Sequence, residues 1–181
     1  VDSWFDVHLE QALEDALELS RTVLDTRMRD LLGRTETMTA QLDHVPNEQA
    51  ASALSRLSNG SDAGELTGRT VNGKIIASSG TNSDRLLPSY PDEAVMLQLR
   101  EGVTYVGLDQ IPGVGLNIRV VAPVAGPDGR VLQVLYPVSE RLALLTDNVQ
   151  STYASYDRLR YLRDRLKFSF ALTLSLVLLL S

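Results

Sequence analysis

Apolar residues in the first quarter of the chain recur at helical spacing and predict one long helix over residues 1–44. They form two lines: Phe5, Leu9, Ala12, Ala16, Leu19 and Val23 in the first, and Leu13, Leu17, Leu24, Leu31 and Met38 in the second. Two adjacent lines make an apolar band wide enough to contact both a partner helix and the helix's own domain. The alternative is two ordinary core helices, with Gly33 as the residue that bends or interrupts the pattern.

The middle of the chain has the shorter periods of a sheet. A short helix is predicted over 48–58, followed by strands over 65–71 and 74–79 that flank Asn72-Gly73. Asn-Gly between two β-prone runs predicts a type I′ hairpin turn. A helix over 92–100 and strands over 104–109, 116–122 and 130–136 follow. Glycine-rich turns join these strands, and such short connections require antiparallel neighbours. The predicted fold class is α+β with a five-stranded antiparallel sheet.

The end of the chain is uncharged and apolar. A helix that begins at Pro137 leads into residues 168–180, FSFALTLSLVLLL, whose polar side chains are hydroxyls. A bilayer-spanning helix needs about 20 such residues, so we interpret this run as the start of a transmembrane helix. We expect a second such helix before Val1, with Trp4 near the bilayer interface. The alternative is a buried C-terminal helix of a soluble domain.

A basic cluster just before this run fits poorly with an extracytoplasmic domain, because positive residues usually lie on the cytoplasmic side. The cluster consists of Arg158, Arg160, Arg163, Arg165 and Lys167. An upstream transmembrane helix can override this tendency. The alternative interpretation is a solvated helix face that contacts anionic lipid.

Composition excludes several classes of function. The 181 residues carry a net charge of −6, which argues against nucleic-acid binding. The chain contains no cysteine and two histidines, so we expect no disulfide, no metal site and no cofactor. The alternative is metal binding through Asp62, Asp84, Asp92 or Asp109, whose spacing does not resemble an EF-hand. Ser78 and Ser79 have no histidine near them in sequence to act as a base, and no phosphate-binding glycine loop is present. We therefore expect a non-catalytic segment.

Two runs resemble the single Cache family of PAS-like extracytoplasmic sensor domains. Residues 66–80, LTGRTVNGKIIASSG, resemble the Cache hairpin that ends in a small-Ser-Ser-Gly loop. Residues 121–137, VAPVAGPDGRVLQVLYP, resemble the hairpin before the exit helix. Residues 9–25, LEQALEDALELSRTVLD, look like the sensor region of NtrY-type nitrogen-regulation histidine kinases. In that family the phosphotransfer helix and the ATPase domain lie downstream, so the resemblance implies that this segment has no kinase activity.

The resemblance implies a periplasmic domain anchored in the bacterial inner membrane. We expect a membrane-proximal dimerisation helix at 1–45, a sensor core at 46–137, an exit helix at 138–167 and the start of a transmembrane helix at 168–181. The signal would pass as a displacement of the last helix relative to the first, in a homodimer formed through the long helices. Alternatives are a chemoreceptor sensor domain and a non-catalytic membrane-anchored scaffold.

A ligand site is predicted on one face of the sheet. Period-two alternation places Asn117, Arg119 and Val121 on one face and their neighbours on the other. A buried Arg119 would be costly without an anion. We therefore expect Arg119, with Arg69, Tyr105 and Tyr136, to line a site for a small carboxylate or similar anion. The alternative is a half-exposed sheet face with an internal salt bridge and no ligand.

Overall fold

The computed structural model describes residues 2–81, 87–126 and 129–144. The chain divides into two compact units. One is Leu24–Ser139, which contains the sheet, and the other combines Val1–Val23 with Glu140–Ser181. Of the second unit, the structure describes residues 2–23 and 140–144.

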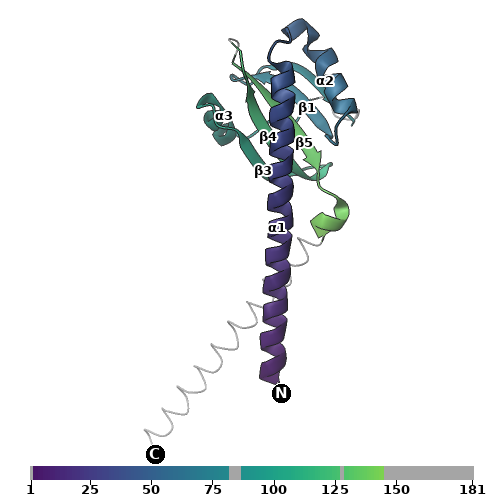
Figure 1. Cartoon of the computed structure of the whole chain (residues 1–181), viewed down its shortest axis with the longest axis vertical. Helices are drawn as coiled ribbons and strands as arrows, with labels where there is room; N and C mark the ends of the chain where they lie inside the picture. Colours follow the sequence, from purple (N-terminus) through teal and green to yellow (C-terminus); the bar gives the residue numbers. More distant parts are fainter. Residues whose placement is uncertain (1, 82–86, 127–128, 145–181) are drawn as a thin grey trace, which may run out of the picture. The chain divides into compact units, whose positions relative to one another are not determined.

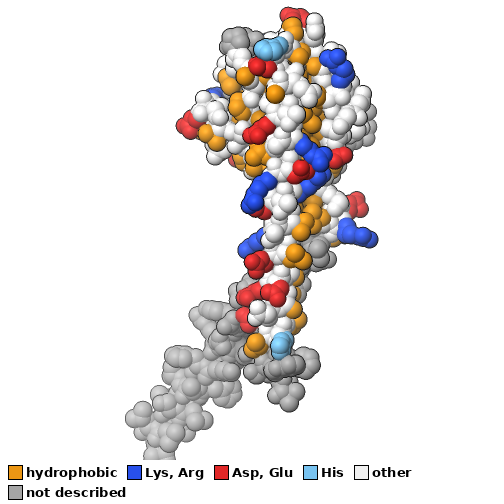
Figure 2. All heavy atoms as spheres, viewed as in Figure 1, with side chains coloured by type: hydrophobic (Ala, Val, Ile, Leu, Met, Phe, Trp, Pro, Cys, Tyr) orange, Lys and Arg blue, Asp and Glu red, His pale blue; other side chains and the backbone are white. Residues whose placement is uncertain are grey.

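The predicted N-terminal helix is a single element, α1, Asp2–Leu42. It continues through Gly33, where an added Cβ would meet no atom within 4 Å, so no close packing requires glycine there. The second apolar line becomes buried in the C-terminal half of the helix, at Leu24, Leu31 and Met38. On the face seen in Figure 2, acidic and basic side chains are interspersed along the exposed side of α1.

The remaining elements lie close to their predicted ranges. They are the 3-10 turn η1 (Asn47–Gln49), the helices α2 (Ala50–Asn59) and α3 (Glu93–Arg100), and the strands β1 (Glu65–Thr70), β2 (Ile75–Gly80), β3 (Tyr105–Ile111), β4 (Gly115–Val124) and β5 (Arg130–Pro137). The carboxylate of Asp92 caps α3 by accepting a hydrogen bond from the backbone N–H of Glu93.

The five strands form one antiparallel sheet in the order β2-β1-β5-β4-β3 (Figure 1). The fold class predicted from the sequence is therefore confirmed. The first and last strands of the sheet core, β1 and β5, lie side by side, so the chain leaves the sheet next to the strand by which it entered.

The predicted type I′ turn at Asn72-Gly73 is wrong. A type I′ turn needs a positive φ at both central residues. Gly73 has a φ of +88°, but no residue other than glycine has a positive φ in the described parts of the chain, so Asn72 does not have the φ that this turn needs. The hairpin closes instead between Thr70 and Lys74, with the N–H of Gly73 donating to the carbonyl of Thr70. The N–H of Val71 donates to the carbonyl of Gly129, a contact from a distant hairpin that helps to select this longer turn.

One face of the sheet is covered by α2 and the C-terminal half of α1. Figure 1 shows this half of α1 crossing β4 and β5. The main core lies between them, and Leu31, Leu54, Leu66, Ile118, Val120, Leu132, Val134 and Tyr136 are among its buried residues. A smaller cluster covers part of the other face, where Val95, Met96 and Leu99 of α3 pack with Val121 and Val131. Burial of these side chains is the main force that holds both layers to the sheet.

The C-terminal predictions fall largely outside the described residues. Residues 140–144 are helical, at the start of the predicted exit helix. The predicted transmembrane run, 168–181, lies outside the described ranges. Within those ranges no helix has the length and apolar character needed to cross a bilayer.

Candidate functional site

A buried polar cluster lies on the sheet face opposite α1. Its central members are Arg69 of β1, Arg119 of β4 and Gln133 of β5, which are 1%, 4% and 0% exposed. Cross-strand pairing puts them on one face of the sheet. Thr67, two residues before Arg69, pairs with Gln133, and Gln133 in turn pairs with Val121, two residues after Arg119. Cations this deep in a protein require compensation by acceptors or by opposite charge.

The segment that precedes α3 contributes the centre of the cluster. We call residues 87–91 the strap. Its Ser89 accepts hydrogen bonds at the backbone carbonyl from Gln133 Nε2 at 2.7 Å and from Arg69 Nη2 at 3.0 Å. The hydroxyl of Ser89 accepts from Arg119 Nη2 at 2.8 Å, and its backbone N–H donates to Glu65 Oε1 at 3.2 Å. One strap residue therefore joins three strands.

Arg119 has a carboxylate partner within the sheet. Its Nε donates to Asp109 Oδ2 at 2.9 Å, and its Nη2 makes a second, short contact with the same oxygen. Its Nη1 donates to Gln133 Oε1 at 2.8 Å. This is the internal salt bridge of the alternative interpretation, so the charge of Arg119 is compensated without a bound anion.

Arg69 is compensated less completely. Its Nη2 donates to the carbonyl of Ser89, and its Nη1 makes a long 3.4 Å contact with the carbonyl of Gly73. Its Nε is the one buried side-chain nitrogen or oxygen in the described ranges that has no hydrogen-bond partner. The ring of Tyr90 lies 5.0 Å from the guanidinium carbon, within cation–π range. Burial lowers the pKa of Arg69 below its usual value, although arginine stays charged in proteins.

The structure brings three of the four predicted site residues to this face. Arg69 and Arg119 both bind Ser89, and Tyr105 pairs with Val121 and packs against the α3 cluster. Tyr136 does not join them. It pairs with Ile118 on the opposite face, and its hydroxyl lies 2.9 Å from Thr35 Oγ1 of α1.

Sequence reasoning missed Ser89, Gln133 and Glu65. Gln133 could have been found, because it is a polar residue within an otherwise apolar strand, RVLQVLYP. Ser89 lies in a connecting segment with no periodic pattern, and its only signal is the pair of prolines around it, Pro88 and Pro91.

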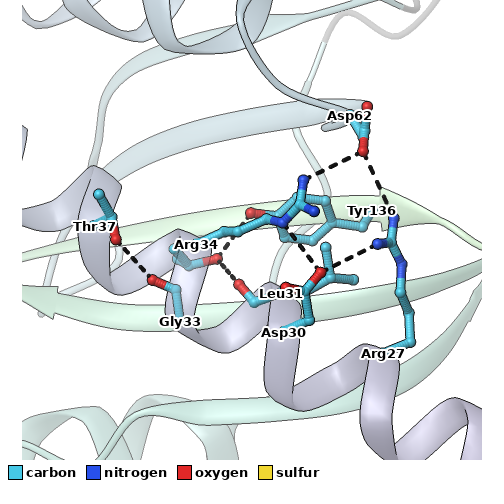
Figure 3. Close-up of polar contacts among 9 residues, drawn as sticks. Arg27, Asp30, Leu31, Gly33, Arg34, Thr37, Asp62 and Tyr136 are labelled. Atoms are coloured by element: carbon cyan, nitrogen blue, oxygen red, sulfur yellow. Dashed lines mark hydrogen bonds and ion pairs between the residues drawn. The ribbon is translucent and has the colours of Figure 1, made fainter.

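A second polar network lies on the α1 side, away from the candidate site. Arg27 and Arg34 of α1 both pair with Asp30 and with Asp62, which follows α2 (Figure 3). All four side chains are substantially exposed, so each pair contributes at most about 1 kcal/mol to stability. We interpret this network as a structural contact between α1 and the loop after α2. No cluster of three potential metal ligands occurs within the described ranges.

The sheet, the helix that crosses it and the polar opposite face together define an α+β domain with two distinct sides. No protein-family model matches the sequence, and no curated protein matches it significantly. Among solved structures, the ligand-binding domain of the Campylobacter jejuni chemoreceptor Tlp3, solved with L-valine, matches with a TM-score of 0.51 and 16% identity. The match covers 77% of this chain and 63% of that one, so the chain spans less than two thirds of the matched Tlp3 chain. This likeness shows the fold.

Two further structures are less similar. The Bacillus subtilis YkuI protein, which has an EAL domain and was solved with c-di-GMP and calcium, has a TM-score of 0.45 and 9% identity, over 72% of this chain and 35% of that one. The GAF domain of a putative sensor histidine kinase from Pseudomonas syringae pv. tomato has a TM-score of 0.29 and 17% identity, over 79% of this chain and 98% of that one.

Proposed function

We propose that the chain is the extracytoplasmic sensor domain of a bacterial membrane receptor, most specifically a histidine kinase of the NtrY type. The observation that carries the proposal is the buried Arg69 guanidinium with an unpartnered Nε, on the sheet face opposite α1. A buried cation with an unused donor is suited to bind an anion. The ligand proposed is a small carboxylate. This segment is non-catalytic in our proposal.

The two faces of the sheet suggest how a signal would pass. The ligand face and the face covered by α1 are the two sides of the same strands, because neighbouring residues in a strand point to opposite faces. Gln133 of β5 contacts Ser89, whereas Tyr136, three residues later, contacts Thr35 of α1. A shift of β5 would therefore change the packing of α1 and the start of the exit helix. The proposed output is a population shift between two such packings.

We further propose that α1 forms a homodimer through its N-terminal half. The first apolar line follows the 3-and-4 spacing of a coiled-coil seam at positions 9, 12, 16, 19 and 23. Leu9, Leu19 and Val23 on this line are exposed, whereas Leu24, Leu31 and Met38 on the second line are buried. The two lines thus supply separate surfaces, one for the domain and one for a partner helix. The proposed location is the periplasmic side of the inner membrane, with the lipid bilayer as a further partner.

Two other functions predict different downstream sequences. A chemoreceptor would carry a long cytoplasmic coiled coil, and a membrane-anchored scaffold would carry no signalling domain. A phosphoacceptor-histidine helix followed by an ATPase domain in the same gene supports the kinase. The sequence of the complete gene is the observation that separates the three.

Titration with simple carboxylates tests the ligand proposal. Acetate and formate should raise the melting temperature of the chain, since a ligand that binds only the folded state stabilises it. The Arg69→Ala variant should lose this increase, while Arg100→Ala, which removes an exposed arginine of α3, should keep it. Arg69→Lys serves as a second variant, because it keeps the charge but loses the planar fork. An unchanged response in both Arg69 variants would exclude Arg69 as the anion site.

A further inference from the structure

Ser89 uses every polar group it has within the candidate site. Its N–H, carbonyl and hydroxyl bind Glu65, Arg69 with Gln133, and Arg119, respectively. These partners belong to three different strands, and all of them face Ser89. A residue of a connecting segment therefore has the set of contacts that a small polar ligand would have.

The match between Ser89 and Arg69 is incomplete in charge and in geometry. The Nε and Nη2 donors lie on the same edge of a guanidinium group, and a carboxylate can accept from both at once. The carbonyl of Ser89 accepts from Nη2 and leaves Nε without a partner. Among the hydrogen bonds of Arg69 within the described residues, both acceptors are neutral carbonyls. The Glu65 carboxylate acts on Arg69 by its charge and not as a hydrogen-bond acceptor. A carboxylate in place of the Ser89 carbonyl would supply the second acceptor and a directly hydrogen-bonded negative charge.

We propose that Ser89 is a built-in substitute for the ligand: its carbonyl holds the position that a ligand carboxylate takes, so that ligand binding and release of the strap are one exchange. This inference rests on the anion site of the proposed function. It adds that the site is occupied by the chain itself in the unliganded state. The apparent affinity for the ligand is then the intrinsic affinity multiplied by the fraction of molecules in which the strap is open, and this fraction is small.

The strap is attached in a way that permits such an exchange. Its Leu87 and Tyr90 side chains are 73% and 57% exposed, so its apolar anchor is the buried Pro91 at the end next to α3, and residues 87–90 are held mainly by polar contacts. The Tyr90 ring lies over Arg69, and its hydroxyl lies against Gly73, where an added Cβ would collide with it. Pro91, the last strap residue, immediately precedes Asp92, the cap of α3. Release of the strap would therefore act on the first turn of α3, which packs on Val121 and Val131.

Acetate titration of three chains by calorimetry tests the exchange. Tyr90→Ala weakens the strap without altering a charged group, and Leu87→Ala is the matched control on an exposed neighbour. Loss of the cation–π contact should raise the apparent acetate affinity of Tyr90→Ala about three- to tenfold over the wild-type chain. Leu87→Ala should bind as the wild type does. Equal affinities in all three chains would overturn the exchange while leaving the anion site intact, and no binding in any of them would remove the anion site as well.

A second measurement follows the strap directly. Because the chain has no cysteine, Ser89→Cys places a single thiol at the point of exchange, and Val134→Cys places one in the buried core as a reference for global unfolding. The thiol at position 89 should react with a soluble disulfide reagent at least about tenfold faster than the reference, since local opening needs less energy than unfolding. Acetate should accelerate the reaction at position 89 only. Equal protection of the two thiols, or slower labelling at position 89 with acetate bound, would overturn the proposal.

Discussion

Thr35 Oγ1 of α1 and Tyr136 Oη of β5 lie 2.9 Å apart, and both residues are buried. The hydroxyl of Thr35 also donates to the carbonyl of Leu31 at 2.8 Å. A threonine hydroxyl has one proton, so Tyr136 must be the donor in its bond to Thr35. The contact joins the long helix to the last strand, one residue before Pro137 ends that strand.

Removal of either partner should destabilise the domain, but by different amounts. Tyr136→Phe removes the donor and leaves Thr35 bonded to Leu31, so we expect a loss of about 0.5–1.5 kcal/mol in the free energy of unfolding. Thr35→Val leaves the buried Tyr136 hydroxyl without an acceptor and should cost more, about 1–3 kcal/mol. Urea denaturation of both variants measures the two losses.

The double variant Thr35→Val with Tyr136→Phe is the control for this assignment. It removes both partners, so no buried group is left unpaired, and it should be more stable than Thr35→Val alone. If Tyr136→Phe were the more damaging single change, the donor assignment would be wrong.

Tyr136 should also make the free energy of unfolding depend on pH in the alkaline range. Burial raises the pKa of Tyr136 above its ordinary value of 10.0. In the unfolded chain the phenol ionises near pH 10, while the folded chain still holds the proton. The folded state then binds more protons than the unfolded state, so stability is fully present below about pH 10 and falls as pH rises toward the folded pKa.

Denaturation between pH 8 and pH 11 checks this dependence. The stability difference between the wild type and Tyr136→Phe should shrink as pH rises, since the variant lacks the titrating group. A difference that stays constant over this range would mean that the phenol ionises equally in both states.

Much of the sheet could be predicted because its signals are local. Alternation within 116–122 predicts that Arg119 and Ile118 point to opposite faces of the sheet. In the structure Ile118 is buried in the main core, and Arg119 is buried on the other face. The hairpin turn at Asn72 could not be predicted in the same way. The pairing of β1 with β2 shifts register between Gly68 and Arg69, and the N–H of Val71 bonds to Gly129, which lies outside the hairpin.

The candidate site was predictable only in part, because it depends on register between strands. Arg69 and Arg119 lie on one face because β5 stands between β1 and β4 in a fixed register. Tyr136 is an odd number of residues from Gln133, so once that register is known it must point to the α1 face. Ser89 is placed by tertiary contacts alone, since no hydrophobic period or turn motif positions the strap over the sheet.

The ion pair between Arg119 and Asp109 should be structural. Asp109→Asn removes the opposite charge from a buried guanidinium, and we expect a loss of about 1–3 kcal/mol, less than for a fully buried pair because the Asp109 side chain is 40% exposed. Asp25→Asn, which breaks the exposed pair with Arg29, is the matched control and should cost about 0.5 kcal/mol or less. Urea denaturation measures both. A cost at Asp109 as small as at Asp25 would mean that Arg119 is compensated by other groups.

The proposed dimer can be tested on its exposed apolar line. Leu19 is 66% exposed and lies at the seam spacing, so Leu19→Glu should place like charges opposite each other across a paired helix. We expect the dimer dissociation constant, measured by analytical ultracentrifugation, to rise by at least about tenfold, because a buried seam leucine contributes roughly 1.5–3 kcal/mol. Gln11→Glu adds the same charge at an exposed position away from the seam and should leave the constant nearly unchanged. A chain that remains equally dimeric with Leu19→Glu would show that its copies associate through another surface. The first apolar line would then have no proposed partner, whereas the second packs within the domain.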